Sequence, residues 1–127
     1  MTPEVPAVLM ELAALLMKNA QPGVPEPERV SDLSLTALLL TLAAETWDGA
    51  AHVLVEENRA LGGLLGEAGE DRDLRLSALR RENDRLRAAL IDLHVRAEQT
   101  GDEALQARIW AELVASTERR KLSTAPV

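Results

Sequence analysis

The residues best suited to chemistry are acidic and histidine side chains spaced three or four positions apart. They are Glu45, Asp48, His52 and Glu56, with His94 and Glu98 further along the chain. At this spacing each set shares one face of a helix, and carboxylate and imidazole groups together bind metal in di-iron helical bundles. Those bundles use inward-directed Glu-x-x-His pairs, whereas this chain has Asp-x-x-x-His and His-x-x-x-Glu. The first set also lies opposite the apolar face of its helix. We therefore expect a solvated acidic stripe, with no resident metal or cofactor, and a partly buried His94.

Glu45 and Asp48 also have the Glu-x-x-Asp spacing with which some all-helical nucleotide pyrophosphohydrolases hold Mg²⁺. Such enzymes need a second acidic pair on a neighbouring helix, and the sequence offers no convincing one. No Ser/His/Asp or lysine-based arrangement is recognisable, and no glycine-rich loop follows a strand. We therefore expect a protein that is not an enzyme. The alternative is a helical-bundle enzyme, or a metal- or nucleotide-binding protein, that uses these carboxylates with His94.

The charge distribution argues against nucleic acid as a partner. The net charge is -7, with 3 basic and 11 acidic side chains in positions 1–70 and 11 basic and 10 acidic in positions 71–127. Arginines crowd positions 72–87, but acidic residues alternate with them, as on an exposed helix or one that meets an acidic helix. Binding to phosphates requires a basic footprint that this chain lacks.

The apolar segments do not predict a membrane protein. The most apolar run, at positions 33–44, has 12 residues, whereas a membrane span needs about 20. Glu4 and Glu11 stand where a signal peptide would be basic or apolar. The absence of cysteine excludes disulfides and thiolate metal sites. We expect a cytoplasmic protein without membrane contact.

Composition and periodicity predict an all-α fold. The 127 residues are 46% hydrophobic, but they include no Phe or Tyr and only two Trp. Leu and Ala, which favour helices, dominate the apolar residues, and no run alternates as a strand would. We expect a single helical domain in four parts: an N-terminal helix (1–20), a Pro-rich linker (21–32), a long antiparallel hairpin of helices 2 and 3 (33–99) and a C-terminal helix (100–122).

Local signals set the expected helix ends. Thr2 and Pro3 resemble a helix start, and Pro22, Pro25 and Pro27 exclude helix from the linker. The pair Gly62–Gly63 near the end of helix 2 indicates either fraying or a close approach by another helix, and the sequence leaves both open.

The turns of the hairpin carry their own signals. Gly66 is expected to end helix 2 in a left-handed conformation. Asp71 or Asp73 is expected to cap helix 3, which should begin near position 72. Thr100 and Glu103 have the spacing of a capping box for the last helix.

Leucines at steps of three and four give helix 3 a heptad repeat that should pack on helix 2. A hairpin that turns near Glu70 makes the numbers of facing residues sum to about 140. The expected pairs are Leu61 with Leu79, Leu54 with Leu86, and Trp47 with Leu93. The full set of expected interface and register residues is Trp47, Leu54, Asn58, Leu61, Leu79, Asn83, Leu86, Leu90 and Leu93.

The same register brings Asn58 close to Asn83. A buried amide costs free energy unless it is hydrogen-bonded, so we expect these two side chains to bond to each other and fix the register. The alternative is a parallel leucine zipper, in which Asn83 would meet its own copy across a dimer.

The length of helix 2 suggests an assembly. About 33 residues make a helix of about 50 Å, whereas a domain of this size is only about 30 Å across. We expect the projecting hairpin to bury its apolar stripe in a symmetric homodimer with a four-helix core. The function that follows is that of a non-catalytic helical protein–protein interaction or assembly protein, self-associating through Leu-rich helix faces.

Overall fold

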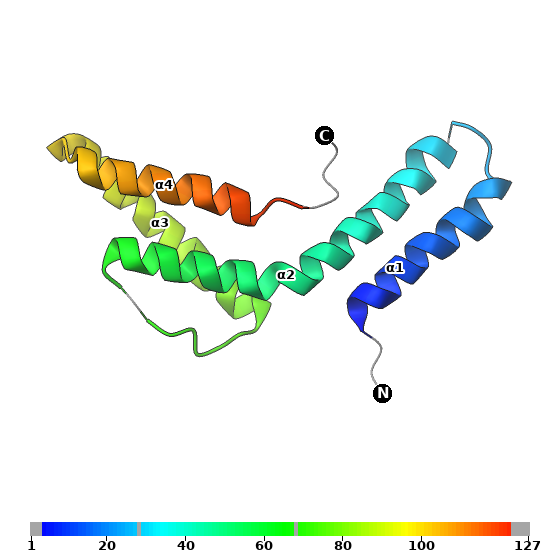
Figure 1. Ribbon diagram of the computed structural model, residues 1–127, viewed down its shortest axis with the longest axis horizontal. Helices are drawn as coiled ribbons and strands as arrows, with labels where there is room; N and C mark the ends of the chain where they lie inside the picture. Colours follow the sequence, from blue (N-terminus) through cyan, green and yellow to red (C-terminus); the bar gives the residue numbers. More distant parts are fainter. Residues whose placement is uncertain (1–3, 28, 68, 123–127) are drawn as a thin grey trace. The chain divides into compact units, whose positions relative to one another are not determined.

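The computed structural model describes residues 4–27, 29–67 and 69–122, and every regular element in them is helical (Figure 1). The four α-helices are α1 (Val5–Leu15), α2 (Ser34–Leu65), α3 (Leu76–Thr100) and α4 (Glu103–Arg119). π-Helical turns follow α1 at Leu16–Ala20 and precede α2 at Arg29–Leu33, and a 3-10 turn covers Gln21–Gly23. The predicted all-α fold with four helices is confirmed. The predicted helix start at Thr2 and Pro3 lies outside the described residues.

The chain divides into two compact units, and the boundary falls within α2. Met1–Gly49 with Leu122–Val127 make the N-terminal unit, and Ala50–Lys121 make the C-terminal unit.

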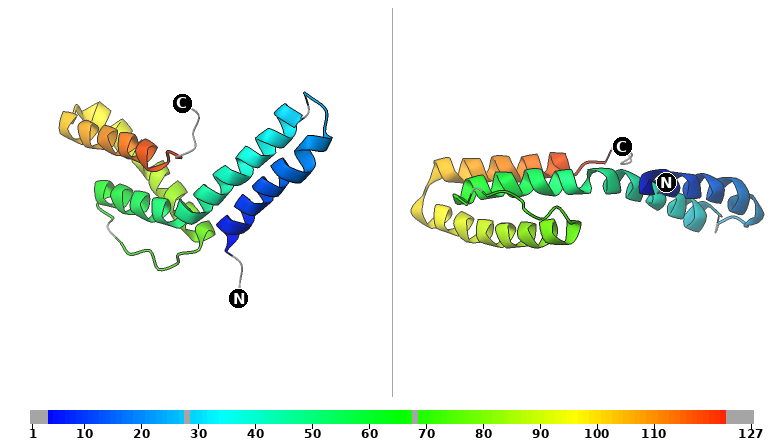
Figure 2. Two further views of the ribbon diagram at one scale, coloured as in Figure 1. Left: turned by 45° about the vertical axis from the view of Figure 1, so that its right-hand side comes forward. Right: turned by 90° about the horizontal axis from the view of Figure 1, so that it is seen from below.

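In the N-terminal unit, α1 and the first half of α2 lie side by side and run in opposite directions (Figures 1 and 2). The buried apolar residues described in this unit are Ala13, Ala37 and Ala44. Because these side chains are small, their burial removes little apolar surface from water, and many longer side chains of both helices stay exposed.

In the C-terminal unit, the second half of α2 and α4 form one layer and α3 passes across them (Figure 2). The buried cluster between these layers contains Leu61, Leu86, Leu90, Ala97 and Ile109. The contact predicted between helices 2 and 3 is confirmed in a hairpin-like form. The chain between them runs back beside α2 before α3 begins, so α3 crosses α2 rather than lying along its whole length (Figure 1).

α2 continues through Gly62 and Gly63 and ends at Leu65. A Cβ atom added at Gly63 would meet nothing within 4 Å, so no helix approaches closely at that position. Gly66 has φ +73°, and the Glu67 N–H donates to the Gly62 carbonyl over 2.8 Å. This hydrogen bond closes a Schellman-type helix end, which requires the left-handed residue predicted at Gly66.

Two predicted helix caps are wrong. α3 begins at Leu76 rather than near position 72, and its N-cap, Arg75, makes no side-chain capping bond. Asp73 instead accepts hydrogen bonds from the backbone and guanidinium N–H groups of Arg75, which hold the chain in a turn before the helix. At the other end α3 runs to Thr100, and Asp102 caps α4 by accepting from the Leu105 N–H over 3.0 Å.

Candidate functional site

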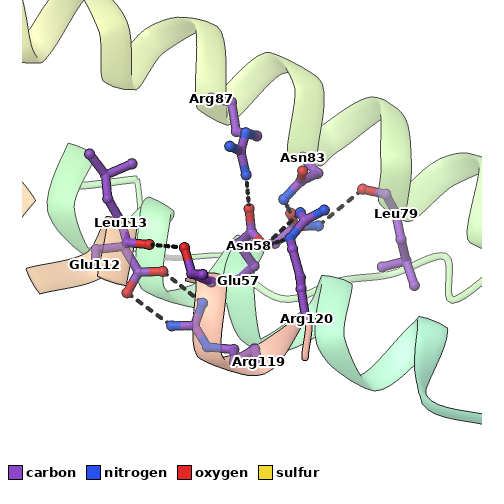
Figure 3. Close-up of polar contacts among 10 residues, drawn as sticks. Glu57, Asn58, Leu79, Asn83, Arg87, Glu112, Leu113, Arg119 and Arg120 are labelled. Atoms are coloured by element: carbon purple, nitrogen blue, oxygen red, sulfur yellow. Dashed lines mark hydrogen bonds and ion pairs between the residues drawn. The ribbon is translucent and has the colours of Figure 1, made fainter. Parts of the chain in front are cut away.

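A polar cluster lies in the C-terminal unit where α2 meets α3 and the end of α4 (Figure 3). The Asn83 Nδ2 group donates to Asn58 Oδ1 over 3.0 Å, and Asn58 Nδ2 donates to the Leu79 carbonyl over 3.2 Å. Both asparagines are buried. The predicted hydrogen bond between these two side chains is present, and it joins α2 to α3.

Glu57, the residue before Asn58, is the centre of the cluster, with its side chain only 1% exposed. Its carboxylate accepts from Arg87 of α3 and from the Nη2 and Nε groups of Arg120, over 2.7 and 3.1 Å. Arg120 directly follows α4. One buried carboxylate therefore ties together three helices, and the two guanidinium groups that hold it are each about half exposed.

The electrostatics of Glu57 reflect opposing effects. Burial raises the pKa of the carboxyl, but hydrogen bonds from Arg120, Asn83 and Arg87 and the charge of Arg120 lower it, and the net pKa lies below its ordinary value of 4.5. The carboxylate is therefore ionised at neutral pH, and the guanidinium groups of Arg87 and Arg120 donate to it. Such a group is a weak proton acceptor, so this geometry suits helix positioning rather than acid–base chemistry.

Arg119 and Glu112 make a second ion pair on α4 beside this cluster (Figure 3). The two guanidinium Nη groups donate to the two carboxylate oxygens over 2.8 and 2.9 Å. Within the described residues, no buried side-chain nitrogen or oxygen lacks a hydrogen-bond partner. A fully partnered polar interior restricts the helices to one arrangement.

Sequence reasoning missed Glu57 and Arg120. Glu57 was passed over because acidic residues are rarely buried, although it lies one turn from Leu54 and Leu61 and adjoins Asn58. Arg120 lies at the end of the last helix, where a basic residue is expected simply because it is favoured by the helix dipole. A buried carboxylate needs a cationic partner. Arg87 of helix 3 was the residue in the sequence that could have indicated burial of Glu57.

The other predicted interface residues are placed unevenly. Five of them are buried within the chain: Leu54, Leu61, Leu79, Leu86 and Leu90. Leu93 is partly buried and packs against the cluster that contains Leu61, Leu86 and Leu90. Leu61 shares its cluster with Leu86 and Leu90, about two and three turns further along α3 than its expected partner Leu79. Trp47, which belongs to the N-terminal unit, is 55% exposed.

The residues considered for metal binding do not converge. In residues 4–27, 29–67 and 69–122, no three His, Asp or Glu side chains are grouped so that they could hold an ion. Asp48, His52 and Glu56 are exposed. His94 is partly buried, as expected, and its Nε2 lies 3.8 Å from Glu98 Oε1.

A cavity of about 300 Å³ lies under the connection between α2 and α3. Its lining includes Asn58, Leu79 and Leu86 together with charged residues of the connection, among them Glu67 and Asp73. The hydrogen bonds from Arg75 lower the pKa of Asp73 to about 2, so this carboxylate is already engaged by a cation. The cavity therefore offers mixed charges without a cluster selective for one ligand.

One described helix, Ser31–Leu65, is long and apolar enough by length and composition to cross a membrane. The apolar run at positions 33–44 is too short by itself to predict a membrane-spanning helix, but the helix that contains this run continues well beyond it. Core helices of soluble proteins meet the same criterion, so the finding shows only that α2 is long and apolar.

Comparison with models of protein families, with curated proteins and with solved structures gives no match.

Proposed function

We propose that this protein is a non-catalytic helical assembly or interaction protein that associates with itself through exposed apolar helix faces. The observation that carries the proposal is the number of large apolar side chains exposed in the described residues. They are Val5, Val8, Met10, Leu12, Leu15, Met17, Leu35, Leu38, Leu39, Trp47, Leu74, Ile91, Val95, Trp110 and Val114. Exposed apolar surface that is contiguous and extensive is typical of an interaction site.

The polar cluster around Glu57 supports the same proposal. Its carboxylate is held by the guanidinium groups of Arg87 and Arg120, which leaves it poorly suited to bind substrate or transfer protons. The inner faces of α2 and α3 are already covered within the chain, with Ile109 of α4 in the same cluster. A self-association contact therefore has to use outer faces of the helices.

Size-exclusion chromatography with light scattering tests this proposal over a range of micromolar concentrations. We expect a species of twice the chain mass of 13.8 kDa, with dissociation on dilution. A protein that stays monomeric throughout this range, with its helical circular dichroism intact, contradicts the proposal.

A further inference from the structure

The exposed apolar residues of α1 form a regular stripe. Val5, Val8, Leu12 and Leu15 follow at steps of three, four and three residues, which places them along one side of the helix. Each exposes 38–48% of its surface. Ala13, the buried residue of α1, points about 100° away from Leu12, so the stripe is not the face by which α1 packs on α2.

The spacing of the four residues in the stripe is the same from either end: three, four and three positions. Two copies of α1 placed antiparallel about an axis between Val8 and Leu12 would set Val5 against Leu15 and Val8 against Leu12 of the second copy. This is the isologous geometry of a two-fold dimer, in which one patch contacts itself. Heptad-like steps of three and four also suit side-chain packing between two helices.

The surrounding surface is large and almost without charge. In the N-terminal unit the exposed large apolar side chains come from both helices: Val5, Val8, Met10, Leu12, Leu15, Met17, Leu35, Leu38, Leu39 and Trp47. Not all of them lie on one face, since Met10 points about 160° away from Leu12 around α1. The four residues of the stripe expose on the order of 300 Å², and the remainder of the roughly 800 Å² that one partner contributes to a stable interface would come from exposed apolar residues of α2. Glu11 is the single charged residue within Val5–Leu15, and positions 33–44 have none.

The charges of this unit favour protein over lipid as the occupant. Positions 1–49 hold 2 basic and 7 acidic residues, which anionic headgroups would repel. Helices that lie on membranes carry Lys and Arg on their polar face, and α1 has neither. A spanning orientation of Ser31–Leu65 would put Glu45 and Asp48 near the centre of the bilayer, where ionised groups are costly.

We infer that a second copy of this chain covers the α1 stripe, so that the two α1–α2 hairpins of a dimer form a four-helix bundle. The inference rests on the proposed function and specifies its surface: the contact is centred on Val8 and Leu12 of the N-terminal unit. It moves the dimer contact away from α3. Because each copy contributes like charges, the dimer tightens as salt rises, since salt screens the repulsion.

The experiment compares three full-length proteins by light scattering and analytical ultracentrifugation. They are the wild type, the double variant Val8→Lys/Leu12→Lys, and the control Ile91→Lys/Val95→Lys. Each variant replaces two exposed apolar residues four positions apart on one helix. Lys is at least as good a helix former as Val or Ile, so circular dichroism should show unchanged helicity in both.

We expect the wild type and the control to be dimers and the α1 variant to be a monomer. The dissociation constant of the α1 variant should rise about 100-fold or more, because two-fold symmetry puts four lysines in the contact. A folded α1 variant that dimerises as tightly as the wild type overturns the inference. If the control then becomes the monomer, the proposed function survives with its contact on α3.

A wild-type protein that is monomeric overturns both the inference and the proposed function. Flotation with neutral and anionic phospholipid vesicles identifies the remaining occupant. Binding of a monomeric wild type to these vesicles, lost in Val8→Lys/Leu12→Lys, would assign the stripe to a membrane surface and refute the dimer.

Discussion

Substitution of Glu57 by glutamine tests the buried polar cluster most directly. Gln has nearly the same size and keeps one carbonyl oxygen, so the change removes charge without making a cavity. The carboxylate now accepts from Arg87 and Arg120 while its side chain is 1% exposed. In the variant, two guanidinium groups lose their common anion and one buried acceptor becomes neutral.

The expected cost follows from the burial of each partner. Breaking a fully buried ion pair by removing one member costs about 3–5 kcal/mol. Here Arg87 and Arg120 are about half exposed, so both guanidinium groups can recover part of their hydration. We therefore expect a loss of about 2–3 kcal/mol in the free energy of unfolding, and a fall in Tm of about 10 °C or more for a domain of this size.

Urea denaturation followed by circular dichroism at neutral pH measures this loss. Glu82→Gln is the matched control, because it removes the same charge from an exposed pair with Arg85. Exposed pairs contribute about 0–1 kcal/mol, so the control should stay close to wild type. A Glu57→Gln variant no less stable than Glu82→Gln would refute the reasoning that the buried cluster stabilises the fold.

The pH dependence of this difference follows from the lowered pKa of Glu57. A carboxyl whose folded pKa lies below its unfolded value stabilises the protein above the unfolded pKa and loses that effect as pH falls through the folded pKa. The stability gap between wild type and Glu57→Gln should thus be constant at and above neutral pH and shrink below about pH 4.5. A gap that stays constant into the acid range contradicts this account.

Three further comparisons between variants, each made by urea denaturation, test other parts of the fold. Asn83→Ala leaves the buried Asn58 Oδ1 without its donor and should lower the free energy of unfolding by about 2 kcal/mol. The double variant Asn58→Ala/Asn83→Ala should lose less than the sum of the two single changes, because the two side chains interact. Strictly additive losses would contradict this interaction. Gly66→Ala should destabilise the protein by about 1 kcal/mol, because φ is +73° at this residue. Gly63→Ala should stabilise it by up to about 1 kcal/mol, because Gly63 lies within α2 with open space around it. Equal effects of the two changes would contradict the left-handed conformation of Gly66 and the helical one of Gly63. Asp102→Ala removes the observed cap of α4 and should cost about 1 kcal/mol, more than Thr100→Ala, and the reverse order would restore the predicted capping box.

Most of what could be predicted of the fold follows from the helical spacing of the apolar residues. Apolar residues recur at helical spacing over long stretches, and burial enforces that spacing regardless of details elsewhere, so the four helices and the contact between helices 2 and 3 were predictable. The Asn58–Asn83 hydrogen bond was predictable for a related reason. A buried amide has to find a partner, and helix geometry leaves few positions from which one can come.

The missed features depend on contacts that no local pattern encodes. Asp71, Asp73 and Thr100 all have capping chemistry, but Arg75 engages Asp73, and α3 runs on through Thr100 to a left-handed Gly101 at φ +67°. Glu57 is held by Arg87 of α3 and by Arg120, which is 63 positions later and reaches it from the end of α4. Its burial could not be read from α2 alone.

The placement of α4 changes which surface is available for the proposed self-association. The sequence suggested that a second copy completes the core of helices 2 and 3, yet Ile109 of the same chain joins Leu61, Leu86 and Leu90 in that core. A helix face that is covered within the chain has no apolar surface left to contribute to a dimer. The N-terminal unit differs, because the residues buried there are alanines and the longer side chains remain in water. The proposed dimer is therefore placed on α1 and the first half of α2.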